Sequence, residues 1–193
     1  MLVDATEAKS GSAILEFARI FGETTCDIIR KSGGVAAQLS QTAQYIPCPR
    51  VTGDIGCFVT FHGDYNGLIV LSFDGAASLD LTRAILTTAG LSGPDLPQHF
   101  ASENARGALG ELTNQVVGHA RVAIQKRWDL NADANVPVVV PLIGLRALEL
   151  HAGGWGENHC VRLSLRTPGQ KRFHLELAME ASAPVSLGPP TTR

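Results

Sequence analysis

Apolar residues recur at helical spacing in three segments of the chain and form strand-length runs between them. The first helix is predicted over residues 12–32, where the glycine pair Gly33-Gly34 provides a stop. The same spacing predicts a second helix over residues 76–89, closed by Gly90, and a long third helix over residues 102–127. The apolar face of the first helix is formed by Ile14, Phe17, Phe21, Thr25 and Ile28.

The segments between and after the helices are predicted to be strands. Three are expected after the first helix, over residues 44–50, 55–62 and 67–74, and Asn66-Gly67 predicts a hairpin between the last two. Four are expected after the third helix, over residues 136–142, 145–151, 159–166 and 172–180. Residues 182–193 are rich in Pro, Ser and Thr, which predicts a disordered tail.

The two long helices share a short motif that indicates an internal repeat. Gly22-Glu23 precedes Gly110-Glu111 by 88 residues, and each pair is followed by similar residues. In the strands, residues 58–62 precede residues 147–151 by 89, and residues 69–73 precede residues 161–165 by 92. The repeat therefore spans about residues 12–74 and 102–166.

These patterns predict one α+β domain over residues 1–181. Each half is expected to be a helix followed by three strands, related by a pseudo-twofold axis, with the long helices packed on a shared antiparallel sheet. The chain has 193 residues, enough to bury a sizeable core without disulfides or a metal.

Composition narrows the classes of function. The 16 basic and 18 acidic residues leave a formal charge of −2, which argues against a nucleic-acid binder. The longest apolar run, residues 136–145, contains two prolines and is too short to span a bilayer. No secretory signal is visible in the sequence. The expected location is therefore cytoplasmic.

No common metal or nucleotide motif is present in the sequence. Cys26, Cys48, Cys57 and Cys160 lack metal-ligand spacing and are expected to be reduced and buried. The glycine-rich stretch between His151 and Cys160 is interpreted as a hairpin loop, with a small-molecule enzyme site there as a remote alternative.

The third helix has an unusual outer face. Its apolar stripe is formed by Leu109, Leu112, Val116, Ala120 and Ile124. On the opposite side Gly107, Glu111, Asn114 and Gly118 form one predicted solvent-facing row, with Gly110 beside it. Because a glycine inside a helix costs about 1 kcal/mol relative to alanine, the row favours a surface that another molecule approaches closely.

The first helix lacks this arrangement. The repeat has an offset of 88 residues, so Arg19 of the first helix corresponds to Gly107, Cys26 to Asn114 and Arg30 to Gly118. The equivalent row is therefore predicted to be crowded and without the amide, so that the site occurs once per chain.

Residues 107–118, GALGELTNQVVG, resemble the signature helix of the CheC/CheX/FliY chemotaxis phosphatases, closest to the CheX branch. The order of elements over about residues 12–180 is also similar to that family's pseudo-symmetric fold. The resemblance implies removal of phosphate from the aspartate of a receiver domain such as CheY. It implies that Glu111 anchors the receiver through its lysine and that Asn114 orients the attacking water. Gly107 departs from the Ser or Asp expected there, which points to altered partner choice or lost activity.

The same resemblance implies that the chain has no cofactor of its own, that the receiver supplies Mg²⁺, and that a homodimer forms through sheet edges. Two functions stay open at this level. The first is an aspartyl-phosphate phosphatase with Glu111 and Asn114 as its catalytic pair. The second is a binding or scaffold module that uses the same helix without hydrolysis.

Overall fold

The computed structural model describes residues 5–150 and 159–180, with side chains from residue 13 onward. The helices are α1 (Ala5–Gly33), α2 (Gly75–Thr88) and α3 (Glu103–Trp128), with a short 3-10 helix, η1 (Gly93–Asp95), before α3. The strands are β1 (Gln38–Tyr45), β2 (Arg50–Thr52), β3 (Ile55–Gly63), β4 (Gly67–Phe73), β5 (Ala132–Ala134), β6 (Val138–Pro141), β7 (Ala147–Glu149), β8 (Cys160–Arg166) and β9 (Arg172–Met179).

Seven strands form an antiparallel sheet with the order β1-β8-β9-β4-β3-β5, in which β6 also pairs with β3. The hairpins β3–β4 and β8–β9 meet at the centre, where β4 pairs with β9 along its whole length, from Gly67 opposite Met179 to Phe73 opposite Phe173. Strand β1, paired with β8, forms one edge of the sheet. Strands β5 and β6, both paired with β3, form the other edge.

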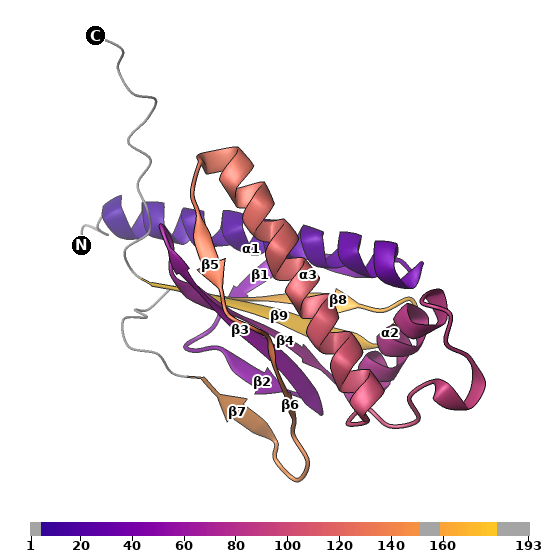
Figure 1. The fold of residues 1–193 in the computed structure, drawn as a ribbon. Helices are drawn as coiled ribbons and strands as arrows, with labels where there is room; N and C mark the ends of the chain where they lie inside the picture. The colour runs from indigo at the N-terminus through magenta and orange to yellow at the C-terminus, as the bar shows by residue number, and fades with distance from the viewer. Residues whose placement is uncertain (1–4, 151–158, 181–193) are drawn as a thin grey trace.

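All three helices lie on one face of this sheet (Figure 1). Helices α1 and α3 cross over the sheet, while α2 packs near one end of both. The inward side chains of α1, α3 and alternate sheet residues form the main core, which includes Phe21, Leu71, Leu109 and Phe173. Successive side chains of a strand point to opposite faces of the sheet, and in β4, β8 and β9 the odd-numbered residues point toward the helices.

The opposite face is partly covered by the two-stranded sheet β2–β7. Val51 and Leu142 pack there on Val70 of β4. Glu176 of β9 is fully buried on this side, pairs with Arg162 at 2.6 Å and accepts the Arg50 N–H at 2.7 Å. Burial raises the pKa of Glu176, although both arginines act in the opposite direction.

The α+β class, the three helices and the β3–β4 and β8–β9 hairpins are confirmed. The strand expected over residues 44–50 is wrong. Residues 46–49 connect β1, which begins at Gln38, to β2 at Arg50. The error arises because β1 is a polar edge strand, exposed over most of its length, and therefore shows little hydrophobic pattern.

The sheet order reads symmetrically from its two edges, as expected for two related halves. However, the strand correspondences inferred from sequence offsets are wrong. The hairpin β8–β9 occupies the place symmetric to β3–β4, so β8 corresponds to β3 rather than to β4. The segment expected to correspond to β3 forms β7, which pairs with β2 outside the main sheet. Runs of four or five apolar residues are too short to fix which strand corresponds to which.

Two expectations fall outside the described residues: the loop after His151 and the disordered tail over residues 182–193. Within the described part of the chain, no helix is both long enough and apolar enough to cross a membrane.

Candidate functional site on α3

Helix α3 is fixed at its start by a capping residue and at its end by an aromatic contact with α1. At its start the Ser102 hydroxyl accepts the Ala105 N–H at 3.3 Å, which satisfies one of the free amides of the first turn. At its end Trp128 stacks on Phe17 of α1, with ring centroids 5.0 Å apart. Between them the predicted apolar stripe, from Leu109 to Ile124, is buried against the sheet. The opposite face of the helix is therefore fixed in orientation.

Four residues of the predicted row are exposed on that face: Gly107, Glu111, Asn114 and Gly118. A methyl group added at Gly107 or Gly118 would meet no atom within 4 Å apart from its chain neighbours and the adjacent backbone of the helix. Packing inside the chain therefore does not require a glycine at either position. The absent side chains leave space on both sides of the acid and the amide.

Gly110 serves a different purpose from the other two glycines. It is half-buried, and a methyl group at this position would lie 3.3 Å from Val139 Cγ2 on β6. The glycine thus permits close approach of α3 to the sheet. In α1 a methyl group at Gly22 would lie 2.9 Å from Leu163 Cδ1 on β8, so both glycines of the repeated motif face the sheet. Gly110 lies next to the open row in the sequence of the helix, but the position of its missing side chain faces β6 rather than solvent.

Glu111 is part of a short hydrogen-bond chain. Gln115, one turn further along α3, donates from Nε2 to Glu111 Oε1 at 2.8 Å. The Ser32 hydroxyl near the end of α1 donates to Gln115 Oε1 at 3.1 Å. Among the residues that the structure describes, no cation pairs with Glu111. Its carboxylate therefore remains available to a cation from outside the chain.

Asn114 is exposed, and its side-chain amide has no partner within residues 5–150 and 159–180. A primary amide offers one acceptor oxygen and two N–H donors. These groups are solvated in the free protein and can bind a water molecule or a polar group of a visiting molecule. The acid and the free amide are three residues apart on the same helix, so they emerge from neighbouring positions.

A cleft of about 300 Å³ adjoins the acid, between the end of α1, α2 and α3. Its apolar walls are formed by Ile85 and Leu86 of α2, by Ala89 just after that helix, and by Leu112 of α3. Gly107, Glu111 and Gln115 also line it, so the cleft is continuous with the exposed row.

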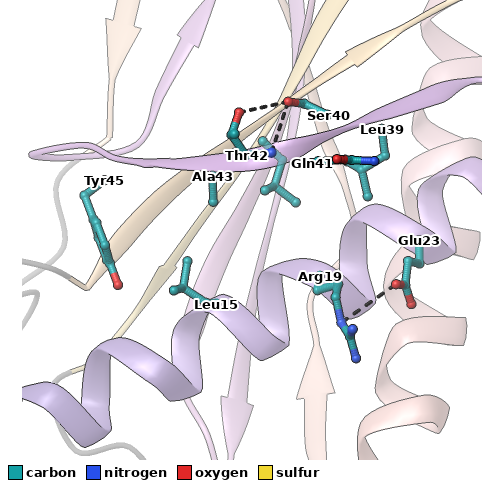
Figure 2. A pocket seen from close by; sticks show the side chains of 10 residues that line it. Leu15, Arg19, Glu23, Leu39, Ser40, Gln41, Thr42, Ala43 and Tyr45 are labelled. Atoms are coloured by element: carbon teal, nitrogen blue, oxygen red, sulfur yellow. Dashed lines mark hydrogen bonds and ion pairs between the residues drawn. The ribbon is translucent and has the colours of Figure 1, made fainter.

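The equivalent row on α1 is different, as predicted. Arg19 and Glu23 are exposed and form an ion pair at 3.8 Å (Figure 2). Arg30 pairs with Asp27, and Cys26 stands where Asn114 stands on α3. A cavity of about 560 Å³ lies between this part of α1 and the edge strand β1, and Figure 2 shows Leu15 directed toward the strand. Side chains therefore occupy this row, whereas the row on α3 is open.

The four cysteines are free thiols, but only two are buried as expected. Cys57 and Cys160 are buried, while Cys26 and Cys48 are half-buried. Burial raises the pKa of Cys57 to about 12 and that of Cys160 to about 11. No three His, Cys, Asp or Glu side chains are grouped as a metal site in the described ranges.

Sequence reasoning did not identify Ser32 and Gln115. The spacing of Glu111 and Gln115 is a known helical hydrogen-bonding pattern and could have been found. The contribution of Ser32 could not, since it depends on how α1 packs beside α3.

A family model described as "Protein of unknown function (DUF3334)" matches residues 19–188, which is well over half of the chain. No curated protein matches in sequence. Among solved structures, CheX from Desulfovibrio desulfuricans is 20% identical with a TM-score of 0.68, covering 86% of this chain and 99% of its own. CheX from Vibrio vulnificus is 17% identical with a TM-score of 0.69, covering 86% and 99%.

A CheX–CheY–BeF3–Mg²⁺ complex from Borrelia burgdorferi matches with 12% identity and a TM-score of 0.60, covering 85% of this chain and 97% of that one. These matches confirm, for the fold, the resemblance carried by residues 107–118. The chain belongs to the DUF3334 family and has the fold of the CheX chemotaxis proteins.

Proposed function

We propose that this chain is a phosphatase that acts on the aspartyl phosphate of a receiver-domain response regulator. In this proposal Glu111 anchors the receiver and Asn114 orients the attacking water. Gly107, Gly110 and Gly118 belong to the partner-binding surface, with Gly110 contributing by bringing α3 close to the sheet. The observation that carries the proposal is the exposed amide of Asn114, which has no partner among the described residues. It lies beside Glu111, which pairs with no cation among those residues, on a row that two glycines leave open.

The chemistry fits these two groups. Transfer of a phosphoryl group to water requires chiefly an in-line position for the water and compensation of charge. A carboxamide can hold the water without the repulsion that a carboxylate would bring near a phosphoryl group. The carboxylate of Glu111 is suited to pair with a lysine of the receiver, because it lacks a cation of its own among the described residues.

Mg²⁺ belongs to the receiver in this scheme, and the chain needs no cofactor of its own. The related complex from Borrelia burgdorferi, in which CheX is bound to CheY with BeF3 and Mg²⁺, supports this division. Catalytic groups from both proteins would then meet at one interface.

The test uses phosphorylated receiver domains from the same organism, with release of phosphate and formation of the complex followed separately. Asn114→Ala is expected to lower turnover about 100-fold, equivalent to about 2.7 kcal/mol of barrier, with little change in binding. Glu111→Ala is expected chiefly to weaken binding, because a charge-assisted contact at an interface contributes to affinity and orientation. Cys26→Asn on α1 serves as a control, since it alters the equivalent position without touching the proposed site.

A non-catalytic scaffold is the second candidate, and Gly107 favours it because the resemblance implies Ser or Asp at that position. Measurable binding with an unchanged phosphate lifetime would select the scaffold. If the wild-type protein binds no phosphorylated receiver, both candidates fail.

The setting of the reaction is also part of the proposal. A chemotaxis pathway, a cytoplasmic location and a homodimer formed through sheet edges follow from the resemblance and stay predictions. The edge strand β1 is the surface on which such a dimer would form.

A further inference from the structure

Gln115 links Glu111 to a different helix. Its Oε1 accepts the Ser32 hydroxyl of α1 at 3.1 Å, and its Nε2 donates to Glu111 Oε1 at 2.8 Å. Gln115 is half-buried at the rim of the cleft between α1, α2 and α3. The orientation of the Glu111 side chain is thus coupled to the packing of α1 beside α3.

The partners fix which way the amide points. An ionised carboxylate only accepts hydrogen bonds, so Nε2 of Gln115 must face Glu111. Its Oε1 then faces Ser32, whose hydroxyl can rotate to donate. A flipped amide would set its oxygen against the carboxylate, which is unfavourable.

The arrangement engages one oxygen of the carboxylate. Glu111 Oε1 receives the amide hydrogen, and within the described residues no other bond is made to Oε2. A free glutamate side chain loses rotamer freedom when it is immobilised, and this loss opposes binding. A glutamate held in advance loses less on binding, which increases affinity.

We infer that Gln115, held by Ser32, is a positioning residue that directs the free oxygen of Glu111 toward a cationic side chain of the receiver. This rests on the proposed function, in which Glu111 anchors the receiver. The residue makes no contact with the phosphoryl group, so its effect is on docking rather than on the chemical step.

The competing explanation is that Gln115 merely stabilises helix α3. Side-chain pairs four residues apart stabilise a helix only weakly. Such a role would change stability slightly and leave the kinetics of phosphate release unaltered. Measuring KM and kcat separately therefore distinguishes the two explanations, since only a positioning role raises KM at nearly constant kcat.

The experiment measures steady-state phosphate release from a phosphorylated receiver for the wild type, Gln115→Met and Ser32→Ala. Gln115→Met is expected to raise KM about fivefold and to leave kcat within about twofold. Ser32→Ala is expected to raise KM less, and Ser32→Thr, which keeps the hydroxyl, to restore it. Gln125→Met makes the same chemical change elsewhere on α3 and is expected to behave as the wild type.

Two further measurements make the inference falsifiable. In a Glu111→Ala background, Gln115→Met is expected to add nothing, because its only target is gone. In the free protein, Glu111→Ala is expected to shift the side-chain amide resonances of Gln115. An unchanged KM in Gln115→Met, or its full effect in the Glu111→Ala background, overturns the inference while leaving the proposed function intact.

A failure of the proposed function gives a different result. If the wild type binds the receiver without accelerating phosphate release, the same comparison is made with dissociation constants for the beryllofluoride-bound receiver, and the same fivefold loss is expected. If the wild type binds no receiver, the inference fails together with the proposed function.

Discussion

Gly107 and Gly118 provide a direct test of whether the open row on α3 is maintained for binding rather than for folding. Both lie inside a helix and are exposed, and a methyl group at either would lie within 4 Å of no atom apart from its chain neighbours and the adjacent helix backbone. Replacing each with alanine therefore adds no clash and removes the conformational cost of glycine in a helix.

The size of the effect follows from helix propensity. Each substitution is expected to raise the free energy of unfolding by about 1 kcal/mol. The two positions are eleven residues apart, or about 16 Å along the helix, so their effects should add to about 2 kcal/mol. For a chain of this length that corresponds to a rise in Tm of about 4–8 °C.

The expected functional effect has the opposite sign. The two methyl groups fill the space on either side of Glu111 and Asn114, so the double variant should bind the phosphorylated receiver more weakly although it is more stable. Gly22→Ala is the matched control in α1. There the added methyl lies 2.9 Å from Leu163 and 3.0 Å from Leu39, and the gain from helix propensity should be lost to overpacking.

Urea denaturation and a binding assay on the same preparations provide the measurement. A double variant no more stable than the wild type would refute the structural part of the reasoning. A stabilised double variant that binds the receiver as tightly as the wild type would show that the glycines do not serve docking.

Three further predictions concern other parts of the molecule. Burial raises the pKa of Glu176, so the folded state favours its protonated form. The free energy of unfolding of the wild type, relative to that of Glu176→Gln, should therefore fall as pH rises from about 4.3 through the folded pKa. A relative stability that grows with pH would contradict this. Iodoacetamide at pH 8 should modify the half-buried Cys48 well before Cys57, whose pKa burial raises to about 12, and equal rates by mass spectrometry would be evidence against the packing of β3. Thr42→Pro, at the bulge of the edge strand β1, should reduce the dimer fraction in sedimentation experiments, whereas a monomeric wild type would exclude the dimer.

The sequence predicted the helices and the two central hairpins because their patterns are strong. Apolar spacing identified the buried stripe of α3, and Asn66-Gly67 identified the β3–β4 turn. Placement of Glu111 and Asn114 on the exposed face followed from the same periodicity. This part of the site could be predicted because it depends on a single helix.

The remaining features depend on contacts between distant segments. Strand β1 is mostly polar and lies at an edge, so the alternation of Leu39, Ala43 and Tyr45 with polar residues is only a weak signal. Its partner β8 is separated from it by most of the chain. The hydrogen bond from Ser32 to Gln115 joins residues 83 positions apart, and no local pattern predicts it. The close approach of Gly110 to β6 likewise depends on how the helix packs on the sheet.

The acid and the amide on α3 belong to one helix, which has a consequence for the diversity of such proteins. Three residues of helix set their separation at about 4.5 Å along the axis, whatever happens elsewhere in the fold. Under the proposed function, substitutions around them, on α2 or along the rim of the neighbouring cleft, would alter which receiver is recognised while that separation stays constant. The choice of partner could then evolve independently of the proposed reaction.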